Sequence, residues 1–143
     1  MTHRRSIGFT ILELVVALAI AAILVMYAVP SYRSYLARGY RIDAASALYR
    51  AAQFVESNPA AGAAALPSGF DQAPRYGAAV YRLRVLLADE TNGGYAVEAV
   101  PVETGPMRDD ACGAFVLHAT GLRSNRAAAH DDAPGGSDCW NTR

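Results

Sequence analysis

The hydrophobic pattern of the chain is dominated by one unbroken run of apolar residues over positions 14–29. Counted from Phe9 to Val29, the segment is 21 residues long, and about 20 residues are enough for a helix to cross a bilayer. The pattern therefore predicts a membrane-spanning helix over residues 9–30. One carboxylate, Glu13, lies near its start, where an ionisable side chain costs at least about 2.5 kcal/mol to insert. That cost makes Glu13 a candidate functional residue.

The apolar pattern becomes amphipathic over residues 31–58. Apolar side chains recur there every three or four positions, as they do on the buried face of a helix. They are Ile42, Ala45, Leu48, Ala52 and Val55. Pro30 is expected to kink or locally loosen the helix, and Asn58-Pro59 is expected to end it. The sequence thus predicts one helix over residues 9–57, about 75 Å long if straight.

Alternating apolar and polar residues predict a β-sheet after a connecting loop at 58–77. Strands are expected at 79–88, 95–100 and 112–120, and the Asn-Gly pair between the first two is a strong hairpin signal. In the first strand, four side chains are expected to face the helix: Tyr81, Leu83, Val85 and Leu87. Arg82 and Arg84 of the same strand are expected to face outward. In the second strand, Glu98 is expected on the outer face. Residues 120–123 are predicted to turn, with irregular chain beyond them. An α+β fold follows, in which residues 59–143 supply a loop, three or four antiparallel strands and a C-terminal region.

Charge composition adds little to this picture. The 143 residues include 13 basic and 13 acidic side chains, so the formal net charge is zero, and the chain has no overall attraction to nucleic acid. Every basic side chain is an arginine, since the sequence contains no lysine. A local basic patch is still compatible with this composition. The residues beyond the apolar helix suit one small globular domain.

The residues around the start of the predicted helix form a recognisable signal. They are Arg4-Arg5-Ser6-Ile7-Gly8-Phe9-Thr10-Ile11-Leu12-Glu13. This stretch resembles the class III prepilin leader of type IV pilins. The resemblance implies a leader peptide at residues 1–8, cleavage between Gly8 and Phe9 by a prepilin peptidase, and N-methylation of Phe9. It also implies that Glu13 pairs with the N-terminal amine of a neighbouring subunit, which would reduce the cost of burying either charge.

The N-terminal segment also has two simpler interpretations, a secretory signal peptide and a plain membrane anchor. A secretory signal peptide would use Arg4-Arg5 as its basic region and Ala17-Leu18-Ala19 or Ala19-Ile20-Ala21 as its cleavage site. A plain single-span anchor would need only the length and hydrophobicity of the segment. Neither interpretation accounts for Glu13 or for the Gly8-Phe9 junction, so the pilin-type signal is favoured. The arginine pair also favours a cytoplasmic N-terminus.

The chain has two cysteines, Cys112 and Cys139, in the part expected to lie outside the cytoplasm. An even number in that compartment predicts one disulfide. It would close a loop of about 28 residues and stabilise the fold by about 2–4 kcal/mol. His118 and His130 lie nearby, but the four residues lack the paired spacing of zinc ligands, so no metal is predicted.

The C-terminal third also resembles pilins. The residues concerned are Cys112-Gly113-Ala114-Phe115-Val116-Leu117, Thr120-Gly121 and Cys139-Trp140. They are especially similar to the short E-type minor pilins of Gram-negative bacteria. The resemblance implies the type IV pilin fold, a long N-terminal helix packed on a three- to four-stranded antiparallel sheet with a disulfide-bounded C-terminal loop. Trp140 is expected to pack against the disulfide.

No catalytic motif is present, so the chain is not predicted to be an enzyme or to hold a cofactor. Two acidic pairs, Asp109-Asp110 and Asp131-Asp132, could serve as calcium ligands like those of some secretion pseudopilins, but they are expected to be solvated.

The favoured function is a structural, minor subunit of a type IV pilus that supports twitching motility, adhesion or DNA uptake. It would span the inner membrane once and then join an extracellular filament, with its globular domain periplasmic or extracellular. The implied partners are other pilins, the prepilin peptidase, the inner-membrane assembly platform and, before assembly, membrane lipid.

Two alternatives remain open at this level. In the first, a competence-type pilin would bind DNA phosphates through arginines. The candidates are Arg82, Arg84, Arg123 and Arg126. No interleaving of aromatic residues with these arginines suggests stacking on bases, so DNA is a possible partner that the sequence itself does not support. In the second, the chain would be a pseudopilin of type II secretion, although the Cys-Trp ending argues against the major pseudopilin.

Overall fold

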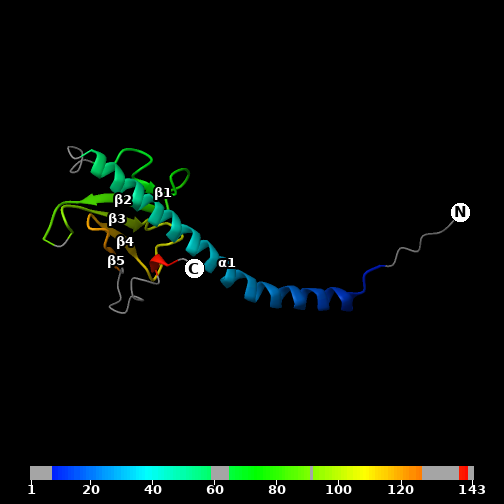
Figure 1. Cartoon of the computed structure of the whole chain (residues 1–143). Coiled ribbons are helices and arrows are strands. Elements are labelled where there is room, and N and C mark those ends of the chain that lie inside the picture. The colour runs from blue at the N-terminus through cyan, green and yellow to red at the C-terminus, as the bar shows by residue number, and fades with distance from the viewer. Residues whose placement is uncertain (1–7, 59–64, 91, 127–138, 142–143) are drawn as a thin grey trace. The chain divides into compact units, whose positions relative to one another are not determined.

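The computed structural model describes residues 8–58, 65–90, 92–126 and 139–141 (Figure 1). One helix, α1, runs over Ile11–Ser57, and five strands follow it along the chain. The chain divides into two compact units, Met1–Leu36 and Ala37–Arg143, and each is described separately. One long helix followed by an antiparallel sheet is the α+β fold that the sequence predicts.

The first unit contains the apolar part of α1. Its large apolar side chains are exposed, from Ile11 to Leu36. Among the described residues, α1 is the one helix long and apolar enough to cross a membrane, and its most apolar window has a mean hydropathy of 2.6. None of that window is buried within the protein.

Helix α1 begins at Ile11, two residues later than predicted, and ends at Ser57 as predicted. Its helical conformation continues without a break through Pro30. The proline therefore removes one backbone donor without dividing the helix into two. At the C-terminal end, Asn58 Nδ2 donates to the carbonyl of Phe54 at 3.0 Å, which satisfies one of the last carbonyls of the helix.

The buried face of α1 in the second unit differs from the predicted one. The buried residues are Ala44, Ala47, Leu48, Ala51 and Val55. Ile42 was expected on this face, but 46% of it is exposed, and the predicted Ala45 and Ala52 are only partly buried. Because this stretch is rich in alanine, several three- and four-residue spacings are equally apolar. The face that is buried is the one whose side chains join the sheet residues in the core.

Five strands form one antiparallel sheet in the order β1-β2-β3-β4-β5, each paired with its neighbour in the chain (Figure 1). Their bounds are β1 Gln72–Ala73, β2 Tyr81–Leu86, β3 Ala96–Pro101, β4 Ala114–His118 and β5 Arg123–Arg126. The three central strands lie within or beside the predicted ones. The prediction of three or four strands is too low, because β1 falls in the expected loop and β5 in chain expected to be irregular.

The inner face of the sheet carries the core that packs on α1. Tyr81 and Leu83 on β2 are buried as predicted, whereas Leu87 lies beyond the end of β2 and is 69% exposed. The Tyr81 ring meets Phe115 of β4 edge-on, with 6.0 Å between ring centroids. Burial raises the pKa of Tyr81. Edge-to-face pairs of this kind contribute about 0.5–1.5 kcal/mol beyond their buried area.

Hydrogen bonds from Tyr95, which directly precedes β3, also connect the sheet to the helix. Its hydroxyl donates to Glu56 Oε1 at 3.0 Å and approaches the carbonyl of Ala52 at 3.4 Å. Burial, followed by the hydrogen bond to Glu56, raises the pKa of Tyr95 to about 12. The hydroxyl therefore stays protonated at neutral pH and keeps its donor role.

The predicted hairpin turn between β2 and β3 is confirmed, and it depends on Asn92 and Gly93. The buried Asn92 side chain accepts from Asp89 N at 3.1 Å and donates to the carbonyl of Leu87 at 2.7 Å. Gly93 has φ +75°, and a Cβ there would lie 2.6 Å from Thr120 Cγ2. Glycine is required because the backbone is left-handed and because the turn after β4 packs directly against it.

Candidate functional site

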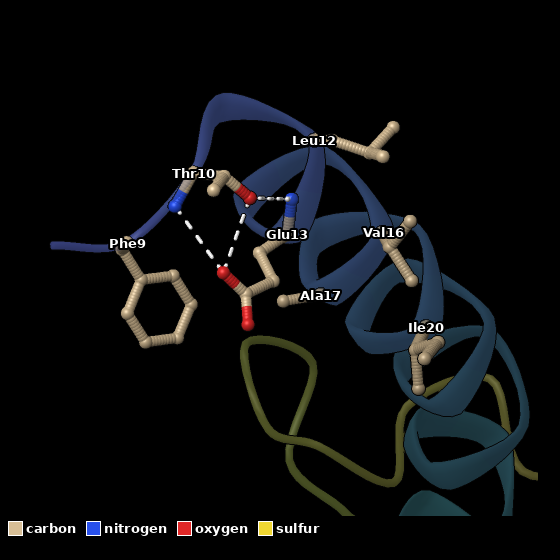
Figure 2. A pocket seen from close by; sticks show the side chains of 7 residues that line it. All are labelled: Phe9, Thr10, Leu12, Glu13, Val16, Ala17 and Ile20. Atoms are coloured by element: carbon tan, nitrogen blue, oxygen red, sulfur yellow. Dashed lines mark hydrogen bonds between the residues drawn. The ribbon is translucent and has the colours of Figure 1, made fainter. Parts of the chain in front are cut away.

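The start of α1 is organised by a reciprocal pair of side chains, Thr10 and Glu13 (Figure 2). Thr10 N and Thr10 Oγ1 donate to Glu13 Oε2 at 3.2 and 3.1 Å, and Glu13 N donates to Thr10 Oγ1 at 3.2 Å. This is a capping box, in which two otherwise unpaired backbone donors of the first turn are satisfied. It explains why the helix begins at Ile11 rather than at Phe9. The sequence contains the signature, a threonine three residues before a glutamate, but the prediction overlooked it.

Glu13 keeps one carboxylate oxygen available beside the chain position where the leader would be removed. Within the residues that the structure describes, all of its hydrogen bonds go to Oε2. The other residues that line the shallow pocket around it are Phe9, Thr10, Leu12, Val16, Ala17 and Ile20 (Figure 2). A carboxylate in mainly apolar surroundings favours a cationic partner, since an ion pair lowers its desolvation cost.

The Gly8-Phe9 junction precedes the capped helix. Both residues are exposed, and Phe9 is 79% exposed. A Cβ placed on Gly8 would meet no atom within 4 Å. The peptide bond between them therefore lies in non-helical, exposed backbone.

The second predicted pair, Cys112 and Cys139, forms a disulfide with a Cα–Cα distance of 5.7 Å. Both cysteines are buried. The bridge places Trp140 against the core, where its ring meets Phe115 edge-on at 5.2 Å between centroids. Trp140 thus packs beside the disulfide as expected, with the β4 aromatic ring as its main contact.

Three of the four arginines considered for DNA binding are paired with acidic side chains. Arg82 lies 3.5 Å from Asp71 Oδ2. Arg84 and Arg126 approach the two oxygens of Glu98 at 2.6 and 2.9 Å. Glu98 was expected on the outer face, and its side chain is only 1% exposed where it meets the two guanidinium groups. The two carboxylates, Asp71 and Glu98, offset two of the three positive charges expected to attract phosphate.

The fourth arginine, Arg123, is different. Its guanidinium carbon lies 5.6 Å from the ring centroids of Tyr49 on α1 and Trp140 beside the disulfide. Both distances are within the range of cation–π attraction. Two aromatic rings therefore accompany Arg123 in space, although no aromatic residue interleaves with it along the sequence. The rings come from positions 49 and 140, so no local sequence pattern reveals them.

The acidic pair Asp109-Asp110 is used in ion pairs. Asp110 receives two hydrogen bonds from Arg41 of α1, at 3.1 and 2.5 Å, and the hydrogen bond to Asp110 raises the pKa of Arg41. Asp109 accepts from Arg108 at 2.8 Å. His118 Nε2 pairs with Ser124 Oγ at 3.0 Å.

No cluster of three metal-ligating side chains occurs in the part of the chain that the structure describes. The other residues considered for metal or calcium binding, His130 and Asp131-Asp132, lie outside the described residues.

Comparisons with known proteins give two family matches. The family described as "Type IV minor pilin ComP, DNA uptake sequence receptor" matches residues 30–116. The family described as "Prokaryotic N-terminal methylation motif" matches residues 3–29. No curated protein matches the chain. The two matches meet at Pro30 and together run from the arginine-rich leader to β4.

Proposed function

Because this chain belongs to the family of the type IV minor pilin ComP, the DNA uptake sequence receptor, we propose that it holds incoming DNA at a pilus. The chain is a type IV minor pilin with an N-terminal methylation motif, and its family is structural rather than enzymatic. The family match over residues 30–116 is the observation that carries the proposal. Its partners therefore include other pilins and the peptidase that processes them.

The prepilin peptidase is proposed to cleave between Gly8 and Phe9 and to methylate the new amine of Phe9. The methylation motif over residues 3–29 supports this assignment. So does the exposed, non-helical backbone at the junction. The arginines at positions 4 and 5 favour placing this junction on the cytoplasmic side of the inner membrane. The globular unit then lies in the periplasm until the assembly platform moves the subunit from lipid into an extracellular filament.

Intact and N-terminal mass spectrometry of the protein from its native host tests the processing. We expect a mature chain that begins at Phe9 and is heavier by one methyl group. A chain that begins after Ala19 or Ala21 would instead indicate an ordinary signal peptidase. An uncut chain that retains Met1 would indicate a plain membrane anchor, and either of these results would contradict the proposed processing.

Glu13 is proposed to pair with the amine of Phe9 from a neighbouring subunit in the filament. The available Oε1 atom and the apolar lining around it support this role. Each charge alone is costly in an apolar filament core, and the cost falls when both are paired. Because every subunit carries one amine and one carboxylate at fixed positions, the pair would set the axial register between neighbours.

DNA binding is tested on the full chain in detergent micelles with duplex DNA drawn from a random-sequence library. We expect binding that weakens steeply as salt rises, because phosphate contacts release counterions, and enrichment of particular sequences over repeated selection. Two controls are used: neutral detergent micelles without protein, and an unrelated membrane protein with a single-span anchor of similar length. Absence of binding at low salt would contradict a receptor role while leaving the pilin assignment intact.

A further inference from the structure

We propose that Arg123 is a base-reading residue of this pilin and that its ligand is the O6/N7 edge of guanine in duplex DNA. The inference rests on the proposed DNA-receptor function and adds to it the residue and the chemical group that it recognises. It separates sequence recognition from the general attraction of arginines to phosphate.

Arg123 is held by elements from three distant parts of the chain. It lies on β5, at the edge of the sheet, while Tyr49 belongs to α1 and Trp140 follows the disulfide cysteine Cys139. The guanidinium lies over both rings at 5.6 Å. Each ring is fixed independently, because Tyr49 belongs to a helix packed on the sheet and Trp140 packs on Phe115. The position of the guanidinium is therefore restricted before any ligand arrives.

The hydrogen-bond donors of Arg123 are not used by the protein. Contact with an aromatic ring goes through the ring face, so it leaves the N–H groups of the guanidinium available. Within residues 8–58, 65–90, 92–126 and 139–141, Arg123 has no hydrogen bond and no carboxylate partner, and it is exposed. Five other arginines are paired with carboxylates: Arg41, Arg82, Arg84, Arg108 and Arg126.

A pre-positioned guanidinium with unused donors fits a planar, bidentate acceptor. The O6 and N7 atoms of guanine form such an acceptor in the major groove, and arginine is its commonest partner. A phosphate also accepts two hydrogen bonds from arginine, but any mobile surface arginine can supply them. The two rings restrict the orientation of the Arg123 guanidinium. A planar acceptor pair such as the guanine edge needs a guanidinium in matching orientation, whereas a tetrahedral phosphate accepts hydrogen bonds from many directions.

Arg75 provides a matched control within the same unit. It also lies over two rings, at 5.9 Å from Phe70 and 5.5 Å from Tyr76, and has no carboxylate partner in the described part of the chain. Tyr76 is its neighbour in sequence and is 78% exposed. Phe70 packs on Phe54 of α1 with 5.1 Å between ring centroids, so one of the two rings under Arg75 is anchored to the helix and the other is not. With one anchored ring, we expect Arg75 to contribute positive charge with a less restricted orientation than that of Arg123.

The experiment compares Arg123→Ala, Arg123→Lys and Arg75→Ala with the wild type, using the full chain in detergent micelles. The probes are the duplex selected by the wild type, copies with each guanine replaced in turn by 7-deazaguanine, and an unrelated duplex. We expect Arg123→Ala to weaken binding of the selected duplex by about 5- to 150-fold, the range of one bidentate base contact. At least one 7-deazaguanine position should weaken wild-type binding and leave Arg123→Ala unaffected.

The salt dependence separates a base contact from a phosphate contact. For a base contact, the slope of log K against log salt should stay unchanged in Arg123→Ala, and Arg123→Lys should keep the charge without restoring discrimination. Arg75→Ala should weaken all duplexes alike. If Arg123→Ala instead weakens all duplexes alike and lowers the slope by about one, Arg123 contacts phosphate and the inference is wrong.

Two further measurements distinguish the loss of base reading from misfolding and from a general loss of DNA binding. Near-ultraviolet circular dichroism should show that each variant retains its aromatic packing, and Tyr49→Leu, which leaves Arg123 in place, should also reduce discrimination without changing the salt slope. If Arg123→Ala binds every duplex like the wild type, the base-reading role is wrong while the receptor function stands. If the wild type binds no duplex at all, both the receptor function and the base-reading role are wrong.

Discussion

Replacing Glu13 with glutamine is expected to exclude the subunit from pili while leaving its amount in the membrane at the wild-type level. Membrane insertion depends on the apolar helix, and Glu13→Gln makes that helix less costly to insert because the charge is removed. Filament entry, in contrast, would leave the amine of the neighbouring Phe9 buried without a counter-charge. Uncompensated buried charges cost several kcal/mol. Immunoblots of sheared pili and of membrane fractions from the native host measure both quantities.

The capping box makes glutamine a sharper choice than alanine. Glutamine at this position can still accept hydrogen bonds from Thr10 and complete the box, so Glu13→Gln removes the charge and keeps the cap. Thr10→Ala is the matched control, because it removes the capping hydroxyl, at a typical cost of about 1 kcal/mol, and keeps the carboxylate. We expect Thr10→Ala to enter pili nearly as well as the wild type. Equal exclusion of both variants would mean that the helix cap, not the charge, is required for assembly.

The apolar half of the chain could be predicted closely because its signal is redundant. Sixteen consecutive apolar residues, from Leu14 to Val29, leave no other structure that satisfies the backbone in a membrane. The start of the helix was placed two residues too early, since its position is decided by two hydrogen-bonding side chains and not by hydropathy. A threonine three residues before a glutamate is the sequence signature of such a cap, and Thr10 and Glu13 have this spacing.

The globular unit was harder to predict because alanine and short polar segments carry little pattern. The buried face of α1 could not be distinguished from neighbouring faces that contain equally small residues. Strand β1 is two residues long, and β5, with the sequence Arg-Ser-Asn-Arg, has no apolar side chain to alternate. Both strands depend on backbone pairing with a neighbouring strand, β1 with β2 and β5 with β4.

The candidate sites also include one part that the sequence predicts and one part that it does not. The cysteine pair could be predicted from number and compartment alone, and the structure joins Cys112 to Cys139. The electrostatic role of each arginine could not, because it depends on which strands lie side by side. Arg84 meets Glu98 across β2 and β3, and Arg123 meets rings about 74 and 17 residues away in sequence. Charge patterns along the chain therefore overestimate the free positive surface.

Replacing both cysteines with serine is expected to lower the free energy of unfolding of the globular unit by about 3–4 kcal/mol. The bridge joins residues 27 positions apart, and closing a loop of that length restricts the unfolded chain by about this amount. Small domains are stable by only about 5–15 kcal/mol, so the loss is a large fraction of the total. Urea unfolding of the full chain in detergent micelles, followed by tryptophan fluorescence, measures it, with the reduced wild type as a control that carries no substitution. A change below about 1 kcal/mol would mean that the bridge adds little to stability.

The variant with both cysteines replaced also tests whether the disulfide contributes to DNA sequence recognition. Without the bridge, Trp140 is no longer tethered next to Phe115, and Arg123 loses one of its two rings. We therefore expect the variant, at temperatures where its sheet remains folded, to lose discrimination between duplexes while it keeps its affinity for unrelated DNA. Trp140→Leu isolates this effect, since it removes the ring and leaves the disulfide closed. If Trp140→Leu discriminates like the wild type, the disulfide serves the fold alone, and the orientation of Arg123 depends on Tyr49.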